Sequence, residues 1–197
     1  MNQSTKPAVV LASTSPFRRA LLEKLGIEFA VDSPDIDESV QEAEKPVELV
    51  KRLAESKAKA VAETHPNALI IGSDQVAVCR GEILGKPGNR GNAIRQLSNA
   101  SGQAVTFYTG LSLYNSAKQS AQTECDTFAV HFRDLSQTQI ERYLDAEEPY
   151  NCAGSFKSEA LGISLFEKLE GDDPNSLIGL PLIRLIRMFQ QEGIQIP

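Results

Sequence analysis

Apolar residues recur along the chain in two spacings, and these spacings predict alternating strands and helices. The runs 8–12 and 68–71 are almost continuously apolar, which is typical of strands buried on both faces. Over residues 46–63, apolar side chains recur every three or four positions, which predicts a helix with one buried face. Expected strands span 8–13, 29–33, 68–73, 76–80, 104–115 and 119–132, and expected helices span 16–25, 46–63, 90–100, 136–145 and 180–192.

The predicted elements carry signals for where they begin and how they connect. Pro46 suits a first helical position, and Ser136 suits the residue that opens the helix after it. The polar turn 115–118 joins two long strands, which predicts a long antiparallel hairpin. Strand–helix units near the start, followed by this hairpin, favour an α/β fold with a mixed sheet and flanking helices. Because no repeat or linker interrupts the chain, we expect one domain over 1–197.

Composition narrows the possible partners. The 197 residues are 41% hydrophobic and 23% charged, with a net charge of −6, which disfavours a broad nucleic-acid-binding surface. No apolar stretch approaches the roughly 20 residues that span a bilayer, so we expect no membrane association. Residues 1–6 are polar and precede only a short apolar run, so a signal peptide is not expected.

The cysteines and histidines offer little chemistry of their own. Cys79, Cys125 and Cys152 lack metal-ligand spacing and are expected to be free thiols in a reducing cytoplasm. His65 and His131 lie far apart outside any motif, so hydrolysis by a Ser-His-Asp triad has little support.

The segment 11–19, Leu-Ala-Ser-Thr-Ser-Pro-Phe-Arg-Arg, predicts a buried strand that runs into a helix. Ser15 suits the N-cap, and Pro16 suits the first helical position. Free backbone N–H groups, the Ser13 and Ser15 hydroxyls and two guanidinium groups are what a phosphate needs. The alternative is a well-capped helix with two solvated arginines, and the segment alone leaves both interpretations open.

Two acidic positions are candidates for catalysis. Asp37-Glu38 lies in a short loop after a strand and is either a solvated turn or a pair of ligands for a divalent cation. Asp74 is expected where the apolar strand 68–73 meets a loop. A carboxylate there is costly unless it binds a partner, a metal or substrate, and α/β folds bind ligands at such strand ends.

Lysines and glycines complete the set of candidates. Lys86 lies in a tight loop, Gly-Lys-Pro, after a short hairpin, and Lys57 lies on the helix 46–63. Spacing alone does not separate Lys57 from the other lysines of that helix. Gly110 interrupts a strand, which marks a bulge or a close backbone approach. No Walker A loop and no Rossmann fingerprint is present.

The order of these motifs is more specific than any one of them. The chain resembles the Maf family of nucleoside triphosphate pyrophosphatases from residue 8 to about residue 190. This resemblance implies a mixed α/β fold with a central cleft, similar to that of the inosine triphosphate pyrophosphatases. It also implies metal-dependent cleavage between the α- and β-phosphates, giving a nucleoside monophosphate and pyrophosphate. The motifs are Leu-Ala-Ser-x-Ser-Pro-x-Arg-Arg at 11–19, Asp37-Glu38, Ser56-Lys57-Ala58, Gly72-x-Asp74, Gly85-Lys86-Pro87, Thr109-Gly110, Glu148-Pro149 through Ala153-Gly154, and Gly179-Leu180-Pro181.

The resemblance also assigns roles to particular residues. Asp74 would accept the proton of the attacking water or bind the metal, and Glu38 would help to hold Mg²⁺ or Mn²⁺. These roles suit phosphoryl transfer, which depends mainly on positioning and charge neutralisation. The phosphate chain would be bound by Arg18, Lys57 and Lys86, with support from Ser13 and Ser15.

Three positions depart from the family branch that acts on dTTP and UTP, and they resemble the branch that acts on 7-methyl-GTP. They are Phe17, Gln75 and Glu159. A carboxylate such as Glu159 accepts from guanine N1–H and the 2-amino group, and an aromatic ring such as Phe17 favours a cationic base. A dTTP/UTP pyrophosphatase and a nucleotide-binding regulator of cell division remain alternatives. The expected partner is a small-molecule nucleotide, and a homodimer is left open.

Overall fold

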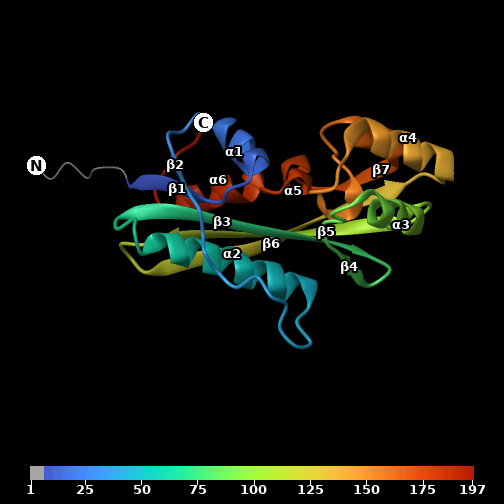
Figure 1. Ribbon diagram of the computed structural model, residues 1–197. Coiled ribbons are helices and arrows are strands. Elements are labelled where there is room, and N and C mark those ends of the chain that lie inside the picture. The colour runs from blue at the N-terminus through green and yellow to red at the C-terminus, as the bar shows by residue number, and fades with distance from the viewer. Residues whose placement is uncertain (1–6) are drawn as a thin grey trace, which may run out of the picture. The chain divides into compact units, whose positions relative to one another are not determined.

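The computed structural model describes residues 7–197, so the expectation about residues 1–6 lies outside the described residues. Within this range, the strands form a mixed seven-stranded sheet in the order β2-β1-β3-β5-β6-β7, with β4 paired to β3 (Figure 1). The strands are β1 (Ala8–Ala12), β2 (Ala30–Asp32), β3 (Ala68–Cys79), β4 (Glu82–Leu84), β5 (Ala104–Asn115), β6 (Ser120–Phe132) and β7 (Phe166–Gly171). The helices are α1 (Pro16–Glu23), α2 (Pro46–Ala62), α3 (Arg90–Ala100), α4 (Gln137–Glu147), α5 (Pro174–Ile178) and α6 (Leu182–Gln191), with 3₁₀ turns at Ala153–Ser155 and Leu161–Leu165.

The chain divides into two compact units, and three long strands contribute residues to both. Unit 1 comprises Met1–Asp74, described from Pro7, together with Thr109–Asp126 and Gly179–Pro197. Unit 2 comprises Gln75–Tyr108 and Thr127–Ile178. The single domain and the central cleft inferred from the sequence stay predictions, whereas the mixed sheet with flanking helices is confirmed.

In unit 1, helices cover both faces of the sheet. Strand β1 pairs in parallel with β2 and with β3. Val10 and Ile70 pack against Ala58 of α2, while Leu11 and Ile71 point to the opposite face and are also fully buried. Figure 1 shows α2 on one side of β1 and β3, with α1 and α6 on the other. Burial on both faces explains why these strands are apolar at nearly every position.

Unit 2 has its own core, in which aromatic rings from separate segments meet edge to face. The ring centroid of Phe156 lies 5.4 Å from those of Phe107 and Phe132 and 5.0 Å from that of Phe166. Aliphatic side chains of α3 and α4, including Leu97, complete this core. Edge-to-face contacts of this kind add to the stability gained from burial alone.

The central hairpin and the first residues of α2 and α4 agree with the predictions from the sequence pattern. Strands β5 and β6 are neighbours joined by the short turn 116–119, so they run antiparallel. Pro46 begins α2, and the Glu48 carboxylate accepts a hydrogen bond from the Lys45 backbone N–H at 3.2 Å. Ser136 caps α4 by accepting from the backbone N–H of Gln139.

The prediction of a break after residue 73 is wrong. Residues 68–79 form one continuous strand, so Asp74 lies inside β3 and not where a strand meets a loop. The Asp74 carboxylate is paired with a lysine, which offsets the cost of its burial, so the charge does not require the strand to end there.

Near the C-terminus the structure adds two elements that the sequence pattern did not predict. Strand β7 is mostly exposed and half of its six residues are charged, so its apolar signal is weak, yet it pairs antiparallel with β6. The short helix α5 occupies a segment expected to be a loop. The last helix begins at Leu182, because Pro181 has extended backbone angles and serves as its N-cap.

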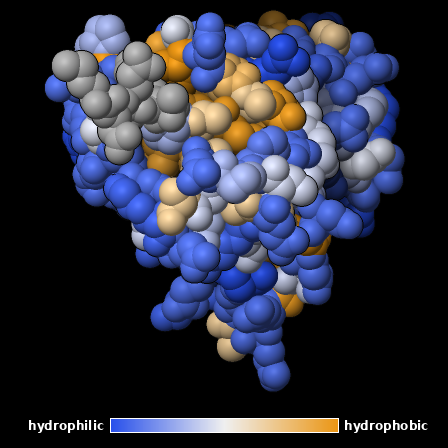
Figure 2. Space-filling model, turned by 90° about the vertical axis from the view of Figure 1, so that its left-hand side faces the viewer, coloured by the Kyte–Doolittle hydropathy of each residue, from blue (hydrophilic) through white to orange (hydrophobic). Residues whose placement is uncertain are grey.

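The surface is mainly polar. Figure 2 shows one face, on which apolar side chains gather in a confined area among hydrophilic ones. No helix formed by the described residues is both long enough and apolar enough to cross a bilayer. The thiols of Cys79, Cys125 and Cys152 are unpaired.

Candidate active site

The junction between β1 and α1 is held together by two serine hydroxyls. Ser15 Oγ accepts a hydrogen bond from the backbone N–H of Arg18 at 3.4 Å, and Ser13 Oγ accepts from the backbone N–H of Ser15 at 3.2 Å. Pro16 occupies the first helical turn. The capped helix start is therefore confirmed. The same contacts fix both hydroxyls at the end of β1, where the resemblance expects phosphate.

The side chain of Arg18 is oriented by the backbone of the Gly-Leu-Pro motif. Its Nε donates to the Gly179 carbonyl at 2.9 Å, and the same carbonyl lies 2.9 Å from the Ser73 hydroxyl. Ser73 Oγ is also 2.8 Å from the Gly110 carbonyl and is fully buried. Gly179 has a φ of 125°, which favours glycine there. Sequence reasoning missed Ser73, because one hydroxyl within a buried strand carries no pattern.

Arg18 lies within electrostatic reach of two carboxylates. Burial lowers the pKa of Arg18 below its usual value, while the Asp74 and Glu38 carboxylates oppose that shift. An arginine remains charged under such a shift. Arg18 is thus a partly buried cation within electrostatic reach of two anions, which suits it to a phosphate.

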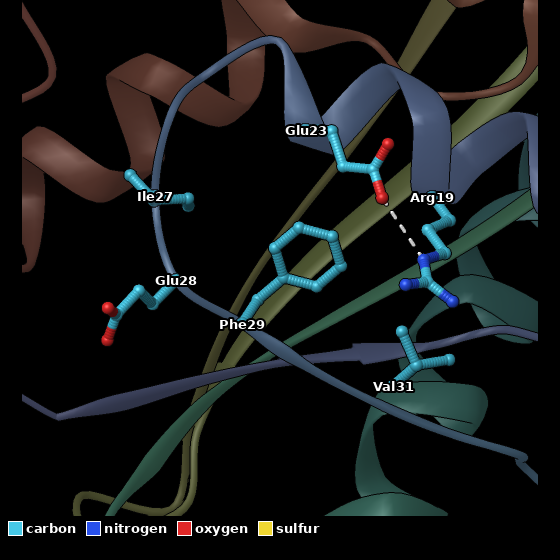
Figure 3. Close-up of a pocket in the computed structure, with 6 residues that line it drawn as sticks. All are labelled: Arg19, Glu23, Ile27, Glu28, Phe29 and Val31. Carbon is cyan, nitrogen blue, oxygen red and sulfur yellow. Dashed lines mark hydrogen bonds and ion pairs between the residues drawn. The ribbon is translucent and has the colours of Figure 1, made fainter.

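The neighbouring arginine makes different contacts. Arg19 Nε pairs with Glu23 one turn later at 3.1 Å, and both side chains are well exposed. It borders a hollow of about 440 Å³, in which the ring of Phe29 lies close to this ion pair (Figure 3). Arg19 is therefore engaged by Glu23, and the phosphate role of Arg18 stays a prediction. Phe17, on the first turn of α1, is 41% exposed. The hollow is lined by Arg19, Glu23, Ile27, Glu28, Phe29 and Val31.

The centre of the candidate site is a lysine between two carboxylates. Lys57 Nζ lies 2.7 Å from Asp74 Oδ1 and 2.8 Å from Glu38 Oε1. The side chains of Lys57 and Asp74 are 8% and 12% exposed, whereas that of Glu38 is 60% exposed. The structure thereby separates Lys57 from the other lysines of α2, which spacing could not do. It also joins the acidic loop to the buried strand.

Two glycines allow α2 to lie close enough for this contact. A Cβ atom at Gly72 would lie 2.0 Å from the Ala54 carbonyl oxygen, and one at Gly110 would lie 2.1 Å from that of Val50. Any larger residue would push the helix away from the sheet. The close approach predicted at Gly110 is confirmed, and the same device operates at Gly72.

In unit 2, Lys86 lies exposed in a loop fixed by backbone contacts. The Gly85 carbonyl accepts from Gln96 at 3.0 Å, and the Gly88 N–H donates to the Tyr150 carbonyl at 2.9 Å. The Lys86 side chain is therefore exposed on a loop whose backbone is held by hydrogen bonds on both sides of it. The loop predicted around Lys86 after a short hairpin is confirmed, and its phosphate role stays a prediction.

The two remaining specificity candidates also belong to unit 2, and they differ in environment. Gln75 Nε2 donates to the carbonyls of Ser176 at 2.8 Å and Leu177 at 3.1 Å, so it anchors α5. Glu159 is exposed, and its carboxylate accepts from the Ser158 hydroxyl at 3.3 Å. Gln75 is therefore committed to a structural contact, whereas Glu159 faces solvent.

Comparisons with known proteins cover almost the whole chain. The chain is 61% identical to a protein of Alcanivorax borkumensis (strain ATCC 700651 / DSM 11573 / NCIMB 13689 / SK2) named 7-methyl-GTP pyrophosphatase, over 97% of each sequence. It is 60% identical to a protein of the same name from Colwellia psychrerythraea (strain 34H / ATCC BAA-681), over 95% of this chain and 94% of that one. A third protein of that name, from Vibrio parahaemolyticus serotype O3:K6, is 59% identical over 95% of this chain and 97% of that one.

Among solved structures, the Staphylococcus aureus Ham1 protein matches with a TM-score of 0.48 and 14% identity, covering 95% of this chain and 100% of that chain. Residues 8–192 match the family described as Maf-like protein, a range that takes in residues of both units. Because this match spans most of the sequence and agrees with near full-length relatives, the chain belongs to the Maf-like protein family.

Proposed function

We propose that this protein hydrolyses 7-methyl-GTP between its α- and β-phosphates, giving 7-methyl-GMP and pyrophosphate. The relatives that are about 60% identical over nearly the whole chain carry the name 7-methyl-GTP pyrophosphatase. The observation that carries the proposal is the grouping of Asp74, Lys57 and Glu38 within ion-pair distance. Arg18 lies within electrostatic reach of both carboxylates.

Cleavage of a phosphoanhydride needs cations that neutralise the phosphate charge and a group that accepts a proton from water, and these residues supply both. Arg18 and Lys57 neutralise the negative charge of the phosphate chain. This stabilises the pyrophosphate leaving group, on which negative charge develops as the bond breaks. When the phosphates bind Lys57, they replace part of the contact between Lys57 and the Asp74 carboxylate. The Asp74 carboxylate then accepts a proton from the attacking water. Ser13 and Ser15 border the end of β1 and support the phosphates there. We also propose that Lys86, in the exposed Gly-Lys-Pro loop, binds phosphate, as the family resemblance implies.

A divalent cation fits the carboxylates that the chain presents. Glu38 and Asp74 both reach the same ammonium group, so two carboxylates already converge on one positive charge. Among residues 7–197, no group of three His, Cys, Asp or Glu side chains is placed to hold a metal. Mg²⁺ commonly takes one or two carboxylates and completes its shell with phosphate oxygens and water. We propose that Glu38 and Asp74 hold Mg²⁺ or Mn²⁺ together with the nucleotide, where the cation neutralises phosphate charge.

Specificity for the methylated base is assigned to three positions. Glu159 is exposed and accepts hydrogen bonds, as recognition of the guanine edge requires, and its negative charge compensates the cationic ring. Phe17 offers an exposed aromatic face on α1, which suits a cationic base. Gln75 acts indirectly, because its amide holds the carbonyls at the end of α5.

We further propose that the protein works in the cytoplasm on a free nucleotide. Its three cysteines are unpaired, as in reducing compartments. The net charge of −6 disfavours long polyanionic partners such as nucleic acids. A homodimer is compatible with this function.

The test is hydrolysis of a nucleotide panel with Mg²⁺ or Mn²⁺, with released pyrophosphate as the readout. The panel contains 7-methyl-GTP, GTP, UTP and dTTP. We expect 7-methyl-GTP to have the highest kcat/KM. Equal or faster turnover of UTP or dTTP would refute the specificity, and a folded protein that hydrolyses none of them would refute the enzyme.

Asp74→Asn separates an enzyme from a nucleotide-binding regulator. Loss of a proton acceptor lowers kcat by about 10²- to 10⁴-fold. The isosteric amide keeps the shape of the site, so nucleotide binding, measured by calorimetry, is expected to persist. A regulator would instead keep its cellular output in this variant.

A further inference from the structure

The loop that carries Glu38 has no regular structure of its own. Residues 33–45 connect β2 to α2 without a helix or strand, and the Glu38 side chain is 60% exposed. Local hydrogen bonds shape only short parts of the loop, such as the bond from the Ser39 N–H to the Asp37 carboxylate at 2.9 Å. An exposed acid on such a loop needs external contacts to hold a fixed position.

Arg52 of α2 supplies such contacts. Its guanidinium pairs with Glu44 through two bonds, from Nε to Oε1 at 2.6 Å and from Nη2 to Oε2 at 2.7 Å. The same Nη2 donates to the carbonyl of Ser39, the residue after Glu38, at 3.0 Å. Arg52 therefore binds the loop at Glu44 and at Ser39, and Ser39 is the neighbour of Glu38 in the sequence.

The geometry of this pair distinguishes it from an ordinary surface salt bridge. The Glu44 side chain is only 7% exposed and that of Arg52 is 26% exposed. Glu44 also accepts the backbone N–H of Gln41 at 3.0 Å, so its carboxylate ties the loop to itself as well as to α2. Two-bond arginine–carboxylate pairs fix orientation, whereas exposed one-bond pairs contribute little.

Helix α2 thus presents two cations to one loop. Lys57 meets Glu38 itself, and Arg52 holds the residues on its C-terminal side. Both cations project from the same helix, so the helix sets the distance between the Arg52–Ser39 contact and the Glu38–Lys57 contact.

We infer that Arg52, locked by Glu44, is a positioning residue that holds Glu38 in place beside Lys57 and Asp74. This inference rests on the proposed function for its catalytic consequence, but the loop contact itself does not. Arg52 touches neither of the candidate catalytic carboxylates through a hydrogen bond in the described contacts. It holds the loop through the backbone at Ser39, and its charge also lies within electrostatic reach of Asp74.

The experiment compares Arg52→Gln and Glu44→Gln with the parent protein. Amide hydrogen exchange of residues 35–41 is measured without nucleotide or metal, and kcat/KM for 7-methyl-GTP is measured with Mg²⁺. We expect faster exchange in this loop for both variants. Partners that orient a metal-binding or catalytic group are commonly worth about 10- to 100-fold in affinity or activity, and we expect a loss in that range.

Two further variants control for general damage. Arg90→Gln removes a more exposed arginine–carboxylate pair, with Asp145 in unit 2, and should leave the loop and kcat/KM unchanged. Arg52→Lys keeps the charge but lacks the planar fork, so it should restore the function only in part. This variant keeps the test open should Arg52→Gln fold poorly.

Unchanged exchange in both loop variants would overturn the inference, and so would faster exchange with an unaltered kcat/KM. A parent protein that hydrolyses no nucleotide would instead refute the proposed function. In that case the exchange measurement alone decides whether Arg52 holds the loop.

Discussion

The Nζ atom of Lys57 lies 2.7 Å from Oδ1 of Asp74, and both side chains are almost completely buried. Each charge satisfies the other in the absence of ligand, which removes much of the penalty for burying either one. The same pair is ready for a phosphate, because the lysine can exchange a carboxylate oxygen for a phosphate oxygen. Stability and proposed function thus depend on one contact.

Lys57→Met is expected to lower the free energy of unfolding by about 3–5 kcal/mol, because it leaves the Asp74 carboxylate buried without its cation. The measurement is urea-induced unfolding followed by circular dichroism. Lys59→Met is the matched control, since Lys59 forms an exposed pair with Glu55, and it should change stability by only a few tenths of a kcal/mol.

A double variant tests the cause. Lys57→Met with Asp74→Leu removes both charges and should recover much of the lost stability, because replacement of a buried pair by apolar groups is often neutral. A double variant as unstable as the single one would show that lost packing, and not an unpaired charge, explains the effect.

Gly72→Ala is expected to destabilise the protein by at least about 2 kcal/mol, because the added methyl group would overlap the Ala54 carbonyl at 2.0 Å. The helix must move away, and it carries Lys57, so nucleotide hydrolysis should fall as well. Thermal unfolding and pyrophosphate release measure the two effects. Gly91→Ala, near the exposed start of α3, where an added Cβ would lie 3.5 Å from Asn89 Oδ1 in ordinary contact, should be neutral or slightly stabilising. Equal stability of the two variants would contradict the proposed close approach.

The Arg52–Glu44 pair predicts a pH dependence of stability. Hydrogen bonding from Arg52 lowers the pKa of Glu44 from 4.5 to about 2. A lowered folded-state pKa gives stability that is fully present above the unfolded pKa and is lost as the pH falls towards the folded pKa. Glu44→Gln should therefore be less stable than the parent protein at pH 6, and the difference should shrink as the pH falls from 4.5 towards 2. Chemical unfolding at pH 6 and pH 3 measures it, and a difference independent of pH would rule out this origin.

Glu159→Gln is expected to reduce the preference for 7-methyl-GTP over UTP. A charge-assisted hydrogen bond is worth about 1.5–3 kcal/mol, which corresponds to roughly 10- to 100-fold in relative kcat/KM. Glu167→Gln, which changes another exposed glutamate in unit 2, should leave the preference unchanged. An unaltered ratio in Glu159→Gln would remove Glu159 from the specificity residues.

Much of the fold was predictable because local patterns reflect it directly. Apolar runs marked β1 and the start of β3, and Pro46 and Ser136 marked helix starts. Strand β7 escaped prediction because its residues are mostly exposed and half of them are charged. The continuity of β3 through Asp74 also escaped it, because the buried carboxylate is stabilised by a lysine 17 residues earlier in the sequence.

The sequence by itself determined most of the element types, because these follow from local spacing and composition. The order of its motifs also gave the resemblance to the family, and that resemblance supplied the candidate catalytic residues. Only the tertiary structure decided which of the α2 lysines pairs with Asp74. It also decided that Arg18 donates to the Gly179 carbonyl, whereas Arg19 pairs with Glu23. The hydrogen bond from Arg52 to the acidic loop likewise appears only in the folded protein. The reason is physical: ion pairs and carbonyl contacts form between residues far apart in the chain. Their partners are chosen by helix orientation and by glycine-permitted close approach, which no local pattern records.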